Sequence, residues 1–213
     1  MIKAIVNKHS VAICLAASVI LMVIAAMKYP GGSLLDKNSV GFGWSKNFFS
    51  NLFEEKAING SENPGRIWAI AGMAFHSVGY GLFFIHMSKK IASGRWAGVL
   101  RFIGILNIIF IFLIATPLHD IGVISIVLTL LGLFTVTVFL LKSRRHWLKF
   151  FCIACLLTYY GFFMCFGLGY LDASFVMQKI YVVSSMLLVI ALEYFTGRDD
   201  FMELSGKSKQ KRS

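Results

Sequence analysis

The chain has 213 residues, of which 57% are hydrophobic and 15% are charged, and it carries a formal net charge of +11. This composition is too apolar for a soluble domain of this length, and it predicts an integral membrane protein. Signatures of soluble enzymes, such as phosphate-binding loops, dinucleotide-binding glycine patterns and nucleophile elbows, do not occur in the sequence.

Six apolar stretches are each long enough to cross the ~30 Å hydrocarbon core of a bilayer, which takes about 20 helical residues. We therefore predict an all-α, polytopic membrane protein: a six-helix transmembrane bundle that forms a single domain over residues 1–213. The predicted spans are residues 10–27, 67–87, 97–116, 121–141, 148–170 and 180–196. A cleaved signal peptide is the alternative for the first span, but the apolar length of Val11–Met27 favours an uncleaved helix.

The distribution of Lys and Arg predicts the orientation, because cytoplasmic loops collect positive charge. With the N-terminus inside, fifteen of the 21 Lys and Arg residues lie on the inner side, and the outer side has no net charge. Both termini, including the basic tail of residues 197–213, are therefore predicted to be cytoplasmic, with the loop of residues 28–66 outside. We expect the membrane to be a bacterial cytoplasmic membrane. The positive charge reflects topology and does not indicate nucleic-acid binding.

The outer loop of residues 28–66 is the one long polar segment between apolar spans. Pro30-Gly31-Gly32 and Asn59-Gly60 are turn signals. Between them, aromatic and aliphatic residues recur at helical spacing from Trp44 to Phe53, which predicts a short amphipathic helix. This helix either covers the mouth of the bundle as a lid or packs its aromatic residues on its own membrane span.

Polar and aromatic residues on the outer side are candidate ligand-binding residues, although acids in such loops are commonly only solvated. The candidates are Trp44, Ser50, Asn51, Glu54, Asn59, Glu62, Asn63 and Asp172.

His76 is the clearest ionisable residue inside a predicted span, about 15 Å along the helix from Arg66 at 1.5 Å per residue. Ionisable groups in a bilayer are costly and often functional. His76 is therefore a candidate general base, metal ligand or ligand contact. The alternative is a neutral His that is hydrogen-bonded to a neighbouring helix.

A second candidate lies in the short outer turn Pro117-Leu118-His119-Asp120. Adjacent His and Asp side chains are typical of acid–base or ligand pairs, so His76, His119 and Asp120 are the candidate catalytic residues. Asp120 is also well placed to cap a helix that begins at Ile121.

We predict no cofactor and no metal, with one alternative left open. A metal shared by His76 and His119 would need both rings within a few ångströms of each other, because zinc–nitrogen bonds are ~2.0–2.1 Å long. Their depths in the bundle differ by roughly 9–10 Å at 1.5 Å per residue. A metal site would require a recessed 117–120 turn to close that gap.

Other polar residues within the spans have structural interpretations. Asn107 and the Ser184-Ser185 pair are predicted to form interhelical hydrogen bonds. Cys152 and Cys155 are expected to pack as small apolar residues. Glu193 lies near the inner end of the last span, where Lys and Arg of the inner loops are its expected partners.

The outer loop resembles that of a group of bacterial six-helix membrane proteins, the domain-of-unknown-function 998 family, and more distantly the Frag1/DRAM/Sfk1 group. The resemblance rests on residues 29–33, 41–52, 59–60 and 62–64. It implies a six-helix fold and a membrane location, but no settled activity, and the Frag1/DRAM/Sfk1 group includes eukaryotic proteins linked to lipid-anchor remodelling. Asn51 stands where the related loops are expected to have Asp, which removes a carboxylate from the loop.

Together these features favour a protein that binds a lipid or a membrane partner through an outer-face pocket covered by the 28–66 loop. One alternative is an outer-leaflet hydrolase or transferase that modifies lipids with His76, His119 and Asp120. A small-molecule transporter is the second alternative, although the halves of the chain show no repeat and the spans lack central prolines. Membrane lipids are the expected partners, with another membrane protein as an option.

Overall fold

A computed structural model describes residues 2–201 of the chain, so residues 202–213 of the expected basic tail lie outside the described part. Within residues 2–201 the fold is all-α, as predicted, with isolated bridges in place of strands. The long helices are α1 (Ile2–Met27), α2 (Arg66–Lys90), α3 (Gly94–Leu113), α5 (Ile124–Leu140), α6 (His146–Gly167) and α7 (Leu171–Phe195). The short ones are the 3₁₀ helix η1 (Phe49–Phe53), α4 (His119–Gly122) and the 3₁₀ helix η2 (Arg198–Phe201).

Six helical segments in the described chain are long and apolar enough to cross a membrane, which is the architecture of a multi-pass membrane protein. Three of them differ in detail from the expected spans. Helix α1 begins at Ile2, eight residues before the expected start. The last helix begins at Leu171, nine residues earlier than expected, so only residues 168–170 connect it to α6. The fourth span is divided into α4 and α5 at Val123.

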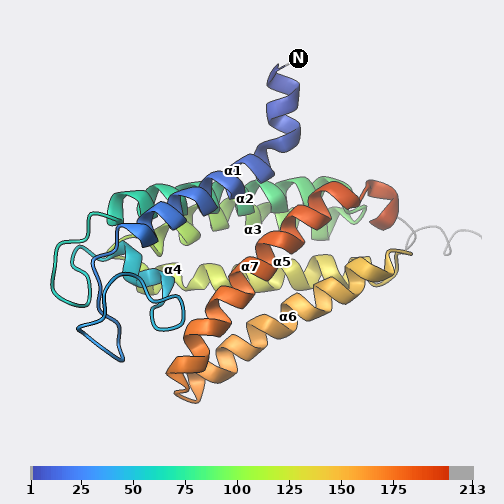
Figure 1. Cartoon of the computed structure of the whole chain (residues 1–213). Coiled ribbons are helices and arrows are strands. Elements are labelled where there is room, and N and C mark those ends of the chain that lie inside the picture. The colour runs from blue at the N-terminus through green and yellow to red at the C-terminus, as the bar shows by residue number, and fades with distance from the viewer. Residues whose placement is uncertain (1, 202–213) are drawn as a thin grey trace, which may run out of the picture.

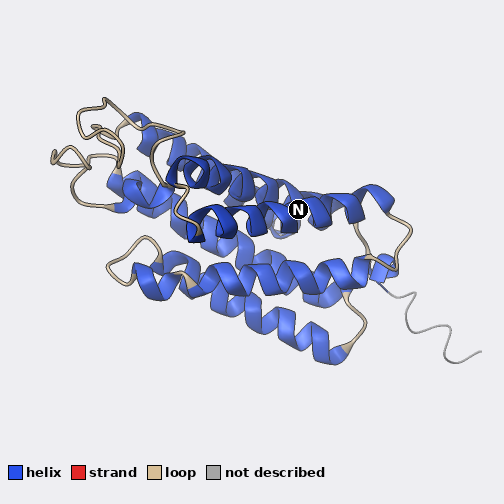
Figure 2. Cartoon of the chain, turned by 90° about the horizontal axis from the view of Figure 1, so that it is seen from below, coloured by secondary structure: helices blue, strands red, loops and turns tan. Residues whose placement is uncertain are grey.

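The helices run up and down, so that the 28–65 loop and the α3–α4 and α6–α7 connections lie at one end, called here the lid end. The connections rich in Lys and Arg lie at the other end, called the basic end. Helix α2 packs between α1 and α3, and α7 packs along α6. Figure 1 shows the α6–α7 pair diverging from α1 and α2 toward the lid end, and Figure 2 shows the loops gathered there.

Glycines allow α2 to approach its neighbours closely, as small residues do in membrane bundles. A Cβ atom on Gly81 would lie 2.2 Å from Ile108 Cγ1 and 2.8 Å from the Gly104 carbonyl oxygen, both on α3. On the α1 side, a Cβ on Gly79 would lie 3.0 Å from Leu15 Cδ2. The backbone of α2 at Gly81 therefore packs directly against the Gly104 backbone and the Ile108 side chain of α3.

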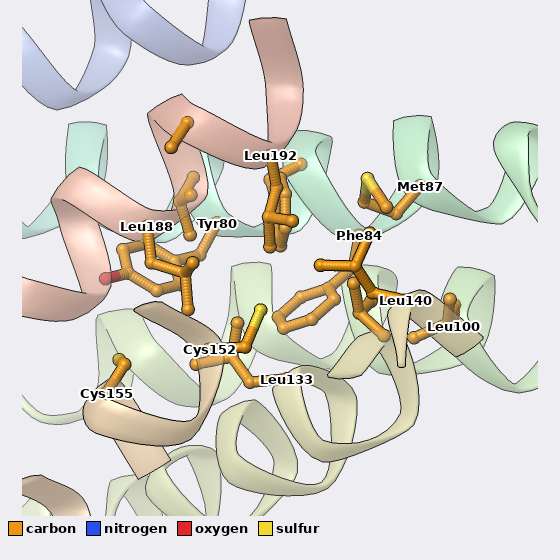
Figure 3. Packing of buried hydrophobic residues seen from close by; sticks show 14 of the residues in the cluster. Tyr80, Phe84, Met87, Leu100, Leu133, Leu140, Cys152, Cys155, Leu188 and Leu192 are labelled. Atoms are coloured by element: carbon orange, nitrogen blue, oxygen red, sulfur yellow. The ribbon is translucent and has the colours of Figure 1, made fainter. Parts of the chain in front are cut away.

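A buried apolar core lies toward the basic end, where α2, α3, α5, α6 and α7 meet. Figure 3 shows Phe84 and Met87 of α2 among side chains of the other four helices. Cys152 and Cys155 are buried in this cluster as free thiols, in agreement with the predicted packing role. Apolar burial of this kind fills space and excludes water, which leaves no room there for a ligand.

Buried polar side chains join the helices in pairs, as predicted for Asn107 and the two serines. The Asn107 amide donates to Thr129 Oγ1 (3.0 Å), which links α3 to α5. Ser184 lies 3.1 Å from Thr158 of α6, and Ser185 lies 2.6 Å from the Tyr80 hydroxyl of α2.

Glu193 has the partner type that the sequence predicts, together with an additional partner. Its Oε2 lies 3.9 Å from Lys90 Nζ, and its Oε1 lies 2.6 Å from His86 Nδ1. Lys90 also donates to the backbone carbonyls of Leu192 and Glu193. This cluster ties the end of α2 to the end of α7 at the basic end.

The α2–α3 contact leads to a stability prediction. Gly81→Ala should lower the melting temperature of the detergent-purified protein, because the added methyl group overpacks the contact at a cost of about 1–3 kcal/mol. Gly98→Ala is the matched control, since it is also helical but a methyl group added there would have no heavy atom within 4 Å. Equal melting temperatures for the two variants in thermal unfolding would contradict this packing.

Candidate functional site

The 28–65 loop forms a folded lid rather than an irregular connection. Its first half closes at a bridge between Gly31 and Val40, and its second half at a bridge between Lys56 and Glu62. The Ile58 N–H donates to the Tyr29 hydroxyl (3.0 Å), and this tie joins the two halves. Burial raises the pKa of the Tyr29 hydroxyl.

The turn glycines of the lid have the role that the sequence predicts. Gly32 has φ +84° and lies so close to the backbone of Ile58 and Asn59 that a Cβ atom would be 2.4 Å from the Asn59 nitrogen. Gly60 has φ +88° at the tip of the second turn. Glycine adopts such positive φ values without the steric cost that other residues have.

Two buried asparagines satisfy the backbone of the lid. Asn47 donates to the Gly32 carbonyl (2.9 Å) and accepts from the Gly43 N–H (3.0 Å). Asn63 donates to the carbonyls of Leu52 and Glu54 (3.1 and 3.0 Å) and accepts from the Gly65 N–H (3.0 Å). Buried backbone polar groups need such partners, so these amides hold the lid in one conformation.

Of the amphipathic helix predicted from Trp44 to Phe53, only Phe49–Phe53 is helical, as the short 3₁₀ helix η1. Its Leu52 and Phe53 side chains are buried with Ala25 and Ala69 of the first two helices. Before η1, Phe48 packs on Phe175 of α7, with ring centroids 4.6 Å apart. The lid therefore covers the mouth of the bundle and also packs its aromatic residues on a span, so both expected arrangements contribute.

Polar contacts also attach the lid to α7. The Phe49 N–H donates to Gln178 Oε1 (2.8 Å), and the Lys179 ammonium group donates to the Asn47 carbonyl. The same ammonium nitrogen lies 5.1 Å from the ring centroid of Phe49 and 5.7 Å from that of Phe42. Lys179 lies about 12 Å along α7 from Leu171 at 1.5 Å per residue, so the lid reaches into the bundle.

A cavity of about 530 Å³ lies under the lid, within the size range of small-molecule sites. All the long helices and α4 contribute to its wall, and lid residues Trp44, Phe48, Phe49 and Phe53 line it from above. Most of the wall is aliphatic or aromatic. The site is therefore suited to an apolar molecule.

A few polar side chains interrupt this apolar wall. His76 lines the cavity and stacks on Tyr80, with ring centroids 4.5 Å apart and planes at 29°. No residue in the 2–201 range forms a hydrogen bond with the His76 ring, in contrast to the hydrogen-bonded His that is the structural alternative. The Tyr80 hydroxyl, in turn, is held by Ser185, whose own hydroxyl donates to the Val182 carbonyl (2.9 Å).

His119 and Asp120 lie in different surroundings. His119 lines the same cavity as His76, whereas the Asp120 side chain is fully exposed and lies 3.6 Å from His119 Nδ1. Helix α4 begins at His119, two residues earlier than expected, and Leu118 is the N-cap residue. The expectation that Asp120 caps this helix is therefore wrong, because Asp120 lies inside the first turn.

Metal-binding groups do not assemble at this site within the described chain. No three His, Cys, Asp or Glu side chains of residues 2–201 converge as metal ligands. His76 and His119 share the cavity wall, but no acidic side chain of the described residues lines it.

The other candidate ligand-binding residues divide into two groups. Trp44 and Ser50 line the cavity. The remaining six do not: Asn51, Asn59 and Asn63 bond to the lid backbone, Glu62 lies 4.0 Å from Lys56, and Glu54 and Asp172 are exposed.

Sequence reasoning does not identify several residues of the site. It places Gln178 and Lys179 in a connection, and it does not distinguish Tyr159 and Tyr181 from other span residues, although both tyrosines line the cavity. Gln178 and Lys179 are adjacent polar residues near the start of an apolar helix, and this pattern indicates that another segment of the protein contacts them. That segment, the lid, becomes apparent only once the fold is known.

Comparison with known proteins adds no relative. No protein-family model, curated protein or solved structure matches the chain. The resemblance to the domain-of-unknown-function 998 family therefore stays a prediction.

The lid structure leads to a second prediction. Asn63→Asp should loosen the lid by about 1–3 kcal/mol, because a carboxylate would face the Leu52 and Glu54 carbonyls that the amide now satisfies. Hydrogen–deuterium exchange of residues 49–58 should become faster. Asn59→Asp is the control, since Asp keeps the oxygen that accepts from the Ser61 N–H. Equal exchange in both variants would mean that Asn63 does not hold the lid.

Proposed function

We propose that this protein binds a lipid or lipid-like molecule in the cavity beneath the lid. The observation that carries the proposal is a largely apolar cavity of about 530 Å³ that is covered by a folded, aromatic lid. Apolar surface in contact with water is unfavourable by roughly 25 cal/mol per Å². A hydrocarbon chain in this cavity would remove such contacts, and the few polar groups would orient it.

The surroundings of the cavity support entry from the membrane. The cavity is partly open, and Val19 and Val23 of α1 and Val183 of α7 both line it and are exposed. Helices α1 and α7 have few contacts with each other, including the His9–Tyr194 pair near the basic end. A chain would therefore enter sideways between these two helices, without crossing the lid.

The proposed orientation has the lid end outside and the basic end in the cytoplasm. It is supported by the positions of Lys89, Lys90, Arg95, Arg145 and Lys149, which all lie at the end opposite to the lid. Because cytoplasmic segments are rich in Lys and Arg, this orientation brings the cavity to the outer leaflet.

A lipid-modifying enzyme is the second candidate, and one observation favours it. His76 and His119 line the same cavity, and the His76 ring has no hydrogen-bond partner within residues 2–201. A free imidazole facing a substrate is suited to general-base chemistry. The exposed position of Asp120 and the surface location of Glu54 favour binding over this alternative.

Filling the cavity tests the binding proposal. The double variant Val182→Phe and Ile126→Phe places two rings in the cavity wall and should remove bound lipid. Native mass spectrometry after detergent exchange should find about one retained lipid per wild-type chain and none in this variant, because the rings occupy the volume that the chain would fill.

The matched control carries the same kind of change away from the cavity. Val78 and Val138 are exposed on α2 and α5 and do not line the cavity, so Val78→Phe with Val138→Phe should retain lipid like the wild type. Equal retention in the cavity-filled and control variants would overturn the proposal.

Substitution of His76 separates binding from catalysis. His76→Gln should leave the melting temperature nearly unchanged, because no hydrogen bond between the ring and residues 2–201 is lost, and should change lipid retention only modestly. Mass spectrometry of lipids incubated with the purified wild-type protein should show no altered product. A product formed by the wild type and absent with His76→Gln would instead establish the enzyme.

A further inference from the structure

We infer that the bound lipid has a headgroup of net negative charge, whose phosphate or carboxylate has no cationic group of its own beside it and is recognised by Lys179 next to the cavity. This inference rests on the proposed function, since it specifies which class of lipid the cavity takes.

The position of Lys179 relative to the cavity is the first argument. Three residues around Lys179 on α7 line the cavity: Gln178, which precedes it, and Val182 and Val183, which follow one turn later. The Lys179 ammonium nitrogen lies 5.1 Å from the ring centroid of Phe49, which is also a lining residue. Lys179 itself lines a neighbouring shallow groove, which shares Val183 with the cavity. The charge therefore lies next to the cavity, under the lid residues Phe42 and Phe49, where the polar end of a bound amphiphile would lie.

The second argument is that this charge is not neutralised. No carboxylate of residues 2–201 forms an ion pair with Lys179, and Asp172, the other charged residue in the first half of α7, lies about 10 Å earlier along the helix at 1.5 Å per residue. The partners of the ammonium group are the Asn47 carbonyl and the faces of Phe42 and Phe49. An ammonium group has three N–H donors, so one carbonyl leaves donors for a ligand.

The cost of this arrangement is the third argument. A charged residue within a membrane-spanning helix is unfavourable and is retained where it pairs or binds. Lys179 is half-buried among apolar residues and aromatic rings. A charge-assisted hydrogen bond to an anion is about twice as strong as a neutral one, and the low polarity of this site strengthens it further.

Neighbouring groups fit the same headgroup. Gln178 uses its carbonyl oxygen to accept from the Phe49 N–H, which leaves its NH₂ group to donate at the cavity wall. Trp44 lines the cavity and is exposed, as expected for a ring at the boundary between headgroup and chain. Lys179, Gln178 and Trp44 would thus surround the polar end of one amphiphile, with its chain below them.

Quenching of Trp44 fluorescence tests this inference in the full-length protein. A single-tryptophan variant, with Trp68, Trp96 and Trp147 changed to Phe, would be placed in vesicles with either dibrominated phosphatidylglycerol or dibrominated phosphatidylcholine of the same chains. Bromine quenches the fluorescence of nearby tryptophan. The binding constants of the two lipids relative to each other therefore follow from how quenching depends on the fraction of brominated lipid in the vesicles. We expect a preference of about tenfold or more for phosphatidylglycerol, as for one charged hydrogen bond.

Variants of Lys179 supply the matched comparison. Lys179→Gln should reduce the preference to about one, and Lys179→Arg should keep it, because the charge is retained. Lys56→Gln is the control, since it removes one positive charge from the same lid end at an exposed position. Free glycerol phosphate should not relieve the quenching, because it lacks the chain; relief would mean that the site binds free phosphate, which would overturn the lipid assignment.

The outcomes distinguish this inference from the proposed function. In one outcome, both lipids quench Trp44 equally in the single-tryptophan variant with Lys179 unchanged, and the Val182→Phe/Ile126→Phe changes reduce the quenching by both. This outcome would overturn the role of Lys179 and leave lipid binding intact. Quenching unaffected by cavity filling would overturn both. The preference for phosphatidylglycerol over phosphatidylcholine is measured with Lys179 unchanged. The inference therefore stays testable even where Lys179→Gln fails to fold.

Discussion

The close approach of α2 to α1 and α3 is the constraint on which the rest of the structure depends. Membrane helices gain little from the hydrophobic effect between them, so small residues and direct backbone contact carry much of their association. Gly81 and Gly104 supply backbone contact between α2 and α3, and Gly72 and Gly79 let the side chains of α1 pack directly on the backbone of α2. These three helices form a compact unit, and the α6–α7 pair joins it through the core and the Glu193 cluster at the basic end. Toward the lid end the same pair diverges, and the space between is the cavity.

The lid covers the space that this divergence of the helices leaves open. An open mouth would expose the apolar wall, and a loop that enters it must satisfy its own backbone groups, because few waters are present to do so. Asn47 and Asn63 meet that requirement within the lid, while Phe48, Leu52 and Phe53 supply its apolar underside. Gln178 and Lys179 fasten it to α7, and Leu52 and Phe53 pack it on α1 and α2, whereas the proposed entrance lies between α1 and α7, beside the exposed Val19 and Val183. The cover and the entrance are therefore separate parts of the site.

Much of this fold follows from the sequence, because apolar length alone specifies a membrane span. The number of spans, the turn glycines, the folded lid and the interhelical roles of Asn107 and Ser185 are all confirmed. The predicted start of α7 is wrong, because Asp172, Gln178 and Lys179 lower the local hydropathy, and the contacts that compensate Gln178 and Lys179 come from residues distant in sequence. The roles of the loop asparagines could not be predicted from the sequence either. An Asn that satisfies a turn and one that faces a ligand have the same sequence signal, and only the fold shows that Asn51, Asn59 and Asn63 bond to the lid itself.

The proposed function depends most on the cavity having an occupant, with the lid above it and the chain between α1 and α7. An experimental structure of the full-length protein in lipid nanodiscs tests this directly. The expected result is an elongated density that runs from beside Lys179 past His76 and Tyr80, with the lid folded over the cavity. A cavity that has collapsed, with the His76 ring hydrogen-bonded to a neighbouring helix and no density beneath the lid, would contradict it.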